Sequence, residues 1–216
     1  CAGIIVGVIG LTGVGLRFSS MLLQIADTSQ FLALIFAMGI SILLGMGMPT
    51  TAAYAVAASV VAPGLVLLGI EPLVAHLFVF YYGVISAITP PVALAVYAAN
   101  SISQGGLWET GIAALKLGAT GYIIPFMFVF GPSLLMIGEW PRIIQAFVTA
   151  GFGITLFAGG LHGYFLTRAN AWQRALLLAG GLLLIDPNWF TDVIGAMIVA
   201  LVLGTQVLSR RAEREQ

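Results

Sequence analysis

The sequence predicts an all-α, polytopic membrane protein. Its 216 residues are 60% hydrophobic and only 7% charged, and the mean hydropathy is +1.09. A soluble domain of average composition carries about 25% charged residues. Apolar segments of membrane-spanning length recur along the chain, and runs of about 20 apolar residues are typical of transmembrane helices. The composition therefore excludes an ordinary soluble domain.

Charge and cysteine content narrow the function classes. Eight basic and eight acidic residues cancel, so no basic surface for nucleic acid is expected. Cys1 is the only cysteine, which excludes an internal disulfide and a cysteine metal cluster. The apolar segments hold no nucleophile with a base, no carboxylate pair and no His-Glu metal spacing, so we expect neither an enzyme nor a resident cofactor. Because the first residue is not Met, we also expect a fragment of a longer protein.

Residues 1–30 are predicted to form the first membrane helix and its loop. Residues 2–26 are apolar apart from Arg17, which we expect to reach the interface or to pair locally, since a charge within a span is costly. Residues 27–30 read Asp-Thr-Ser-Gln and are expected to form a polar loop.

Residues 31–62 are predicted to form a re-entrant helical hairpin. The two apolar arms, 31–44 and 50–62, are each about 20 Å long at 1.5 Å per residue, which is short of the roughly 30 Å hydrocarbon core. No charged residue lies between the arms, and their turn reads Gly-Met-Gly-Met-Pro. Two full spans would need a polar turn at the far surface, so a hairpin closed at Pro63 and Gly64, with its tip at mid-depth, is favoured.

Residues 73–100 are predicted to form a broken transmembrane helix. The helix follows a surface loop, breaks at residues 89–91, which read Thr-Pro-Pro, and resumes as far as Asn100. Asn100 lies beyond the break and is a candidate for contact with substrate. His76 lies near the loop, where packing at the interface is favoured over a proton relay or a metal ligand.

The two breaks place polar backbone in the middle of apolar sequence. A proline has no N–H, so Pro49 leaves the carbonyl of Gly45 without its helical donor, and Pro90 does the same to Ser86. Irregular backbone survives in a membrane only where it is packed in protein or lines a cavity. Many secondary transporters hold substrate and coupling ion at broken helices near mid-depth. We therefore predict that the two breaks form one binding site.

The predicted site uses neutral oxygen atoms for a small cation and helix N-termini for an anion. The candidate cation ligands, mainly through backbone carbonyls, are Gly45, Gly47, Met48, Thr51, Ser86, Ala87 and Thr89. The candidate substrate contacts are Thr50, Thr51, Thr89, Pro90 and Asn100. Thr89 followed by Pro90 also matches an N-cap and N1 pair, which predicts that a new half-helix starts there. The methionine side chains at the first break are expected to serve as flexible packing.

The rest of the chain is divided into two membrane regions. Residues 101–138 are expected to contain an interfacial helix at 107–116 and a transmembrane helix at 117–137. Residues 139–216 are expected to form a C-terminal membrane extension with helices at 143–166, 175–185 and 193–208, the last two joined by a turn at Asp186 and Pro187.

The basic residues predict the orientation. With a cytoplasmic tail carrying Arg210, Arg211 and Arg214, counting spans backwards places Arg168, Arg174 and Lys116 on the same side. The opposite side then receives Asp27, Glu71, Glu139, Asp186 and Asp192, with Arg142 as its one basic residue. This distribution satisfies the positive-inside rule. In this orientation the predicted hairpin at residues 31–62 opens to the outside.

Three motifs carry a resemblance to a known family. They are Leu-Gly-Met-Gly-Met-Pro-Thr-Thr-Ala-Ala-Tyr at residues 44–54, Leu-Gly-Ile-Glu-Pro-Leu-Val-Ala-His at 68–76 and Ala-Ile-Thr-Pro-Pro-Val-Ala at 87–93. In these motifs the chain resembles the large membrane (permease) subunit of tripartite ATP-independent periplasmic (TRAP) transporters, specifically the fused permease of the TAXI branch. The resemblance covers about residues 1–138, and the remainder is similar to the C-terminal extension of fused members.

The resemblance implies an elevator-type transporter half in the bacterial inner membrane, with residues 31–100 as half of a transport domain. It implies sodium-coupled symport of a small organic anion, such as a dicarboxylate, an oxoacid or an amino acid, with Na⁺ as the coupling ion. The sodium site would lie between the tip at 45–51 and the break at 86–89. The implied partners are a periplasmic substrate-binding protein, a small membrane subunit or fused equivalent, and membrane lipid.

The family pattern also has an earlier half with its own hairpin and a second sodium site, which we expect outside this chain. A passive facilitator or channel for small organic solutes, built on the same broken helices, is the alternative function.

Overall fold

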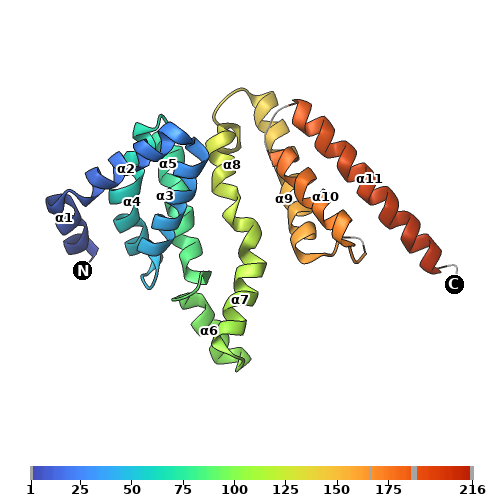
Figure 1. Ribbon diagram of the computed structural model, residues 1–216, viewed down its shortest axis with the longest axis horizontal. Helices are drawn as coiled ribbons and strands as arrows, with labels where there is room; N and C mark the ends of the chain where they lie inside the picture. Colours follow the sequence, from blue (N-terminus) through green and yellow to red (C-terminus); the bar gives the residue numbers. More distant parts are fainter. Residues whose placement is uncertain (1, 166, 186–188, 215–216) are drawn as a thin grey trace. The chain divides into compact units, whose positions relative to one another are not determined.

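The computed structural model describes residues 2–165, 167–185 and 189–214. Cys1 and the expected turn at Asp186 and Pro187 lie outside these residues. The residues that the structure describes are mostly helical and include no β-strand. The all-α prediction is therefore confirmed. The chain divides into two compact units, residues 1–129 and 130–216, and Figure 1 shows the order of their helices.

The first expected helix is bent into two. Helix α1 (Ala2–Thr12) and helix α2 (Val14–Thr28) meet at an angle of 65°. The cause is Gly13, whose φ of 67° is left-handed and interrupts the right-handed helix. Arg17 lies exposed on α2. The expected polar loop at 27–30 is reduced to Ser29, because α2 continues through Thr28.

Helix α4 (Thr50–Leu67) is the centre of the first unit and packs against α1, α2, α3 (Gln30–Gly45) and α5 (Pro72–Ile85). Its contact with α2 is close because a Cβ atom on Gly64 would lie 3.0 Å from a methyl group of Leu22. Small residues allow such close approach between membrane helices.

The prediction that the second hairpin arm ends near residue 62 is wrong, since α4 continues through Pro63 to Leu67. Membrane helices tolerate an internal proline where neighbouring helices pack around it. The end of α4 is set by Gly69, which has a φ of 84°. There the N–H of Ile70 donates to the carbonyl of Leu65 in a Schellman motif.

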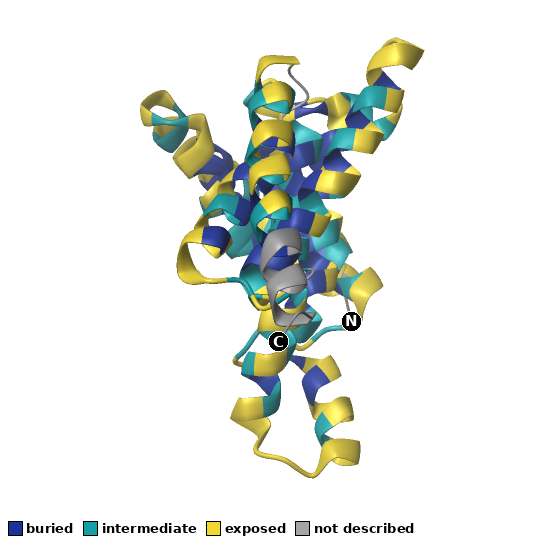
Figure 2. Ribbon diagram, turned by 90° about the vertical axis from the view of Figure 1, so that its right-hand side faces the viewer, coloured by how far each residue is buried: buried dark blue, intermediate teal, exposed yellow. Residues whose placement is uncertain are grey.

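Past α5 the chain forms the 3-10 helix η1 (Ser86–Ile88), a turn, and the helices α6 (Leu94–Ser103) and α7 (Leu107–Gly118). The exposed α6–α7 connection is the yellow end at the bottom of Figure 2.

Helix α7 continues through the 3-10 helix η2 (Ala119–Tyr122) into α8 (Ile124–Phe130). Together Leu107–Phe130 is one helical segment long and apolar enough to cross a membrane. This differs from the expected interfacial helix at 107–116 followed by a separate span, because the 3-10 turn joins the two without a sharp bend.

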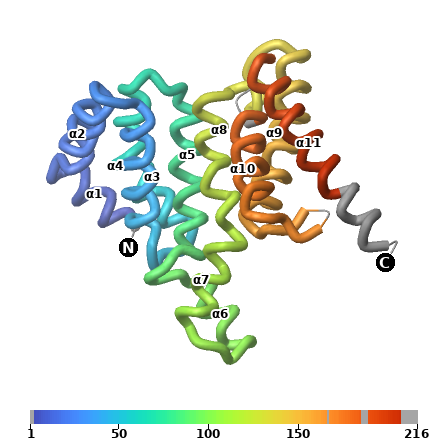
Figure 3. The backbone as a smooth tube through the Cα atoms, turned by 45° about the vertical axis from the view of Figure 1, so that its right-hand side comes forward, coloured from blue at the N-terminus to red at the C-terminus, as the bar shows by residue number. Residues whose placement is uncertain are grey.

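In its described residues, the second unit begins with the 3-10 helix η3 (Pro132–Leu135). The long helices α9 (Trp140–His162), α10 (Ala171–Ile185) and α11 (Trp189–Arg214) follow. Helix α10 packs against both α9 and α11, as the tube in Figure 3 shows. The buried core consists of Leu156, Leu177, Leu184 and Val202.

A basic side chain closes the end of α9. The guanidinium of Arg174, on α10, donates to the carbonyls of Gly160 at 3.0 Å and Leu161 at 2.9 Å. A cation at a helix C-terminus satisfies carbonyls that have no helical donor.

Among the described residues, four helical segments are long and apolar enough to span a membrane: α4, Leu107–Phe130, α9 and Trp189–Gln206 of α11. The bent pair α1 and α2 would make a fifth if it forms one span. Helices α3, α5 and α10 are apolar but shorter. The length and composition of these helices agree with a membrane-integral protein.

Candidate functional site

The first break separates α3 from α4. Helix α3 ends at Gly45, and residues 46–49 turn the chain before α4 begins at Thr50. Gly47 supplies a φ of 76°, which a residue with a side chain rarely adopts. Pro49 takes the N-cap position of α4 and has no N–H. The carbonyl of Gly45 accepts instead from the N–H of Met48, at 3.4 Å.

The second break follows α5. Helix α5 tightens into η1, where the carbonyl of Ser86 accepts from the N–H of Thr89 at 3.2 Å. The next helix, α6, begins only at Leu94, after a turn that contains a cis peptide bond between Pro90 and Pro91. The predicted N-cap role of Thr89 is therefore wrong, because its hydroxyl donates to the carbonyl of Ile85, in the preceding helix.

The structure brings the two breaks together at Gly45 and Ser86. A Cβ atom on Gly45 would lie 2.6 Å from the hydroxyl oxygen of Ser86 and 3.2 Å from the Cα atom of Gly83. A Cβ atom on Gly47 would lie 3.4 Å from a methyl group of Val92, in the second turn. Only glycine fits at position 45 without displacing the other break.

The hydroxyls of the second break are held by backbone carbonyls. Ser86 is 2% exposed, and its hydroxyl donates to the carbonyl of Gly83 at 2.6 Å. The hydroxyl of Thr89 donates to the carbonyl of Ile85 at 2.8 Å. Because each hydroxyl gives its hydrogen to a carbonyl, its oxygen keeps lone pairs that can accept a hydrogen bond or a cation.

Sequence reasoning missed Tyr122, in η2. Its hydroxyl forms a hydrogen bond with the hydroxyl of Thr89, and its backbone carbonyl accepts from the hydroxyl of Tyr82 at 2.6 Å. Since the hydrogen of Thr89 goes to Ile85, the hydroxyl of Tyr122 is the donor in the first of these bonds. Tyr122 thus orients the Thr89 oxygen from a segment distant in sequence.

Glycines allow the α7–η2 segment to approach the second break. A Cβ atom on Gly111 would lie 3.5 Å from the ring of Pro90, and one on Gly121 would lie 3.5 Å from Ile85. A Cβ atom on Gly118 would overlap the terminal methyl group of Ile88. Gly111, Gly118 and Gly121 are spaced by seven and three residues, so they lie on one helix face. This spacing is the sequence signal that could have predicted the contact of this segment with the second break.

The remaining predicted residues occupy different surroundings. Thr50 and Thr51 are exposed in the first turn of α4, and neither side chain hydrogen-bonds to another described residue. Met48 and Ala87 are half-buried. The side-chain oxygen of Asn100 accepts from the hydroxyl of Thr110, on α7, at 3.1 Å.

Asn100 therefore joins α6 to α7. A small pocket of about 180 Å³ lies beside this pair of helices, between Pro90, Tyr97 and Trp108.

A tyrosine and a histidine pair next to the first break. The hydroxyl of Tyr54, on α4, lies 2.9 Å from Nδ1 of His76, on α5, and the ring of Tyr54 packs edge-on against Phe80. His76 itself is exposed. The hydrogen bond thus connects the His76 ring to α4, the helix that starts at the first break.

The arrangement offers oxygen ligands and one helix N-terminus. The described residues hold no group of three or more His, Cys, Asp or Glu side chains that could bind a metal ion. Carbonyl and hydroxyl oxygens suit hard cations without such groups. The first three N–H groups of α4, at residues 50–52, have no helical acceptor and form the positive end of the helix dipole. Such a terminus suits an anionic group.

Comparison with known families supplies two matches. The family described as the tripartite ATP-independent periplasmic transporter, DctM component, matches residues 1–143. A domain of unknown function (DUF3394), which is associated with the large subunits of these transporters, matches residues 143–209. No curated protein and no solved structure matches the chain significantly.

Proposed function

Because this chain belongs to the DctM family of tripartite ATP-independent periplasmic (TRAP) transporters, we propose that it takes part in sodium-coupled symport of a small organic anion. The family consists of secondary transporters of organic solutes, which work with a periplasmic binding protein and a small membrane subunit. Sodium coupling, the anionic substrate, the TAXI branch, the bacterial inner membrane and the elevator movement are parts of the proposal.

One observation carries the proposal: the close contact between Gly45 and Ser86, where two interrupted helices meet. Breaks of this kind are costly inside a membrane unless a ligand or packed protein satisfies them. Midplane breaks in transporters bind substrate and ion. The pairing of two such breaks by a glycine that no other residue can replace supports a shared site.

Sodium is the proposed ligand of the oxygen atoms. Ser86 and Thr89 present hydroxyl oxygens whose hydrogens are already donated to carbonyls. Backbone carbonyls of Gly45, Gly47 and Ala87 are the proposed further ligands, with Met48 and Thr51 at the edge. Proton coupling is less well supported, because the two breaks hold no Asp, Glu or His to titrate.

The substrate is proposed to bind next to this cation at the N-terminus of α4. The exposed hydroxyls of Thr50 and Thr51, together with the N–H groups of the first turn, form donors for a carboxylate. Thr89 and Pro90 are the proposed substrate contacts from the second break. Asn100 is better explained as a link between α6 and α7, since Thr110 already donates to it.

A re-entrant hairpin is also proposed for α3 and α4. Helix α3 has 16 residues, about 24 Å, against a core of roughly 30 Å. Helix α4 has 18 residues and is long enough to span a membrane. Cysteine labelling distinguishes the re-entrant hairpin from two full spans. In a cysteine-free variant, Ser29→Cys and Leu68→Cys should mark the membrane face at which the hairpin opens. Met48→Cys should not react with a membrane-impermeant maleimide that is added at the opposite face. Efficient labelling of Met48→Cys from that opposite face would show two full spans.

The proposed C-terminus is cytoplasmic. The basic residues Arg168 and Arg174 would then lie on the side that the positive-inside rule favours. A fluorescent reporter fused to the C-terminus, active only in the cytoplasm, should give signal.

Uptake into proteoliposomes tests the function. The full permease with its binding protein and small subunit should accumulate substrate under an inward sodium gradient and not under an equal choline gradient. Equal flux without accumulation under both gradients would replace symport with a passive facilitator. Accumulation driven by a proton gradient without sodium would replace the coupling ion.

A further inference from the structure

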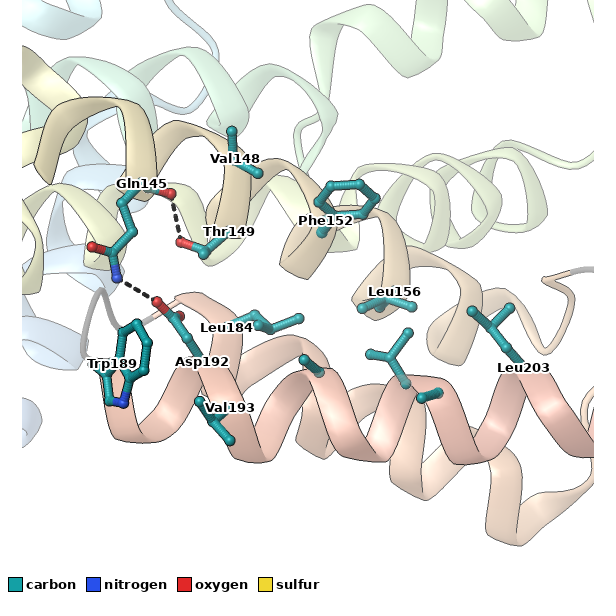
Figure 4. Close-up of a pocket in the computed structure, with 13 residues that line it drawn as sticks. Gln145, Val148, Thr149, Phe152, Leu156, Leu184, Trp189, Asp192, Val193 and Leu203 are labelled. Atoms are coloured by element: carbon teal, nitrogen blue, oxygen red, sulfur yellow. Dashed lines mark hydrogen bonds between the residues drawn. The ribbon is translucent and has the colours of Figure 1, made fainter. Parts of the chain in front are cut away.

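The second unit contains an apolar groove that the proposed transport site does not use. A cavity of about 540 Å³ lies between α9 and α11, as Figure 4 shows. Phe152 and Leu156 line it from α9, and Ala196, Ala200 and Leu203 line it from α11. The volume lies within the range of about 300–1,000 Å³ that is typical of ligand sites. The small side chains of α11 leave this space between the two helices.

One end of the groove is polar. The side-chain amide of Gln145 donates to Oδ2 of Asp192 at 2.7 Å (Figure 4). Oδ1 of Asp192 is buried and has no hydrogen-bond partner among the described residues. The neighbouring hydroxyl of Thr149 donates to the carbonyl of Gln145, within its own helix, at 3.0 Å. A buried carboxylate oxygen without a donor is costly, so this end of the groove lacks a hydrogen-bond donor.

The groove has the length of one membrane leaflet. Asp192 and Leu203 are eleven residues apart on α11, about 16 Å along the helix. Half of the hydrocarbon core is about 15 Å. Asp192 lies near the start of the apolar stretch Trp189–Gln206, and Trp189 is 78% exposed at the same end. Tryptophans gather at the membrane interface, which places the carboxylate at headgroup depth and Leu203 toward the bilayer centre.

We propose that this groove binds a phospholipid with a primary ammonium headgroup, of the phosphatidylethanolamine type. The ammonium donates to Oδ1 of Asp192, and one acyl chain lies between α9 and α11 as far as Leu203. A primary ammonium has N–H donors and a positive charge, so it supplies what the carboxylate lacks. A choline headgroup has no N–H, and an anionic glycerol headgroup would be repelled by the carboxylate.

Lipid titration of the full-length permease, followed by native mass spectrometry, tests this site. The probes are phosphatidylethanolamine, phosphatidylcholine and phosphatidylglycerol with identical acyl chains. The wild-type protein should bind the ethanolamine lipid about tenfold more tightly than the other two, and Asp192→Asn should remove this preference. Glu139→Gln is the matched control, because it removes an exposed carboxylate from the same unit and should preserve the preference.

The acyl-chain part of the site has its own variant. Ala196→Phe should fill the groove and weaken the binding of all three lipids together. Met197→Phe places the same aromatic side chain on the same helix but outside the groove lining, and should not weaken it. Equal binding of the three lipids by the wild-type protein would overturn the proposal. So would a preference that survives in Asp192→Asn, or exclusion of every lipid by a helix of a partner protein.

Discussion

The two units use glycine for different purposes. In the first unit, Gly45 allows two interrupted helices to come into close contact at the Ser86 hydroxyl, where the backbone leaves regular helical geometry. In the second unit, Gly181 lets α10 approach α9, because a Cβ atom there would lie 2.8 Å from the carbonyl of Gly153. The helices at that contact are regular. The chain has 27 glycines, so what distinguishes the candidate site is a close glycine contact that coincides with a helix break.

The sharpest test of this difference is Gly45→Ala. The added Cβ atom would lie 2.6 Å from the Ser86 hydroxyl and must separate the two breaks, so sodium-driven uptake should fall at least about tenfold. Gly39→Ala is the matched control on the same helix, since a Cβ atom there meets nothing within 4 Å. Equal uptake by both variants, measured in proteoliposomes at matched protein content, would remove the contact from the mechanism.

A smaller effect is expected for Tyr122→Phe. This change removes the hydroxyl that donates to Thr89, and a typical hydrogen bond contributes about 1 kcal/mol, or roughly fivefold in affinity. The sodium concentration for half-maximal uptake should rise by about that factor. Tyr164→Phe changes an exposed tyrosine of the second unit and should leave it unchanged. If both variants keep the wild-type value, Tyr122 is packing only.

The smallest effect on transport is expected for Gly181→Ala. Its Cβ atom would overlap backbone atoms of α9, so the variant should lose about 1–3 kcal/mol of stability, seen as a lower melting temperature. Uptake per folded molecule should stay within about twofold. Gly151→Ala, on α9, meets nothing within 4 Å and serves as control. A loss of uptake as large as that of Gly45→Ala would mean that close glycine contacts matter for transport in both units alike.

Sequence reasoning succeeded where single residues determine local backbone. Pro49 and the Pro90 and Pro91 pair lack N–H groups, so the interruptions after α3 and α5 could be located to within a few residues. The general all-α membrane architecture followed from composition. These features depend on residues that act within one turn of the chain.

Prediction from the sequence failed where contacts between distant segments determine the local structure. The sequence predicts one helix through Gly13, whereas the left-handed φ of Gly13 bends the chain by 65°. The sequence predicts a helix end at Pro63, whereas α4, which packs against α2, continues to Leu67. Tyr122 is 33 residues from Thr89 in sequence, and no local pattern indicates that pairing. Residues that support a site from another helix therefore required the structure.

The oxygen atoms at the second break are proposed to bind the coupling sodium ion. Sodium-dependent uptake by Thr89→Ala and Thr89→Ser tests this most directly, with Thr51→Ala as a companion at the first break. Thr89→Ala should raise the sodium concentration for half-maximal uptake about tenfold. Thr89→Ser keeps the hydroxyl and should stay near the wild-type value. Unchanged sodium dependence in both Thr89→Ala and Thr51→Ala would contradict the site, although the fold and the family would stand.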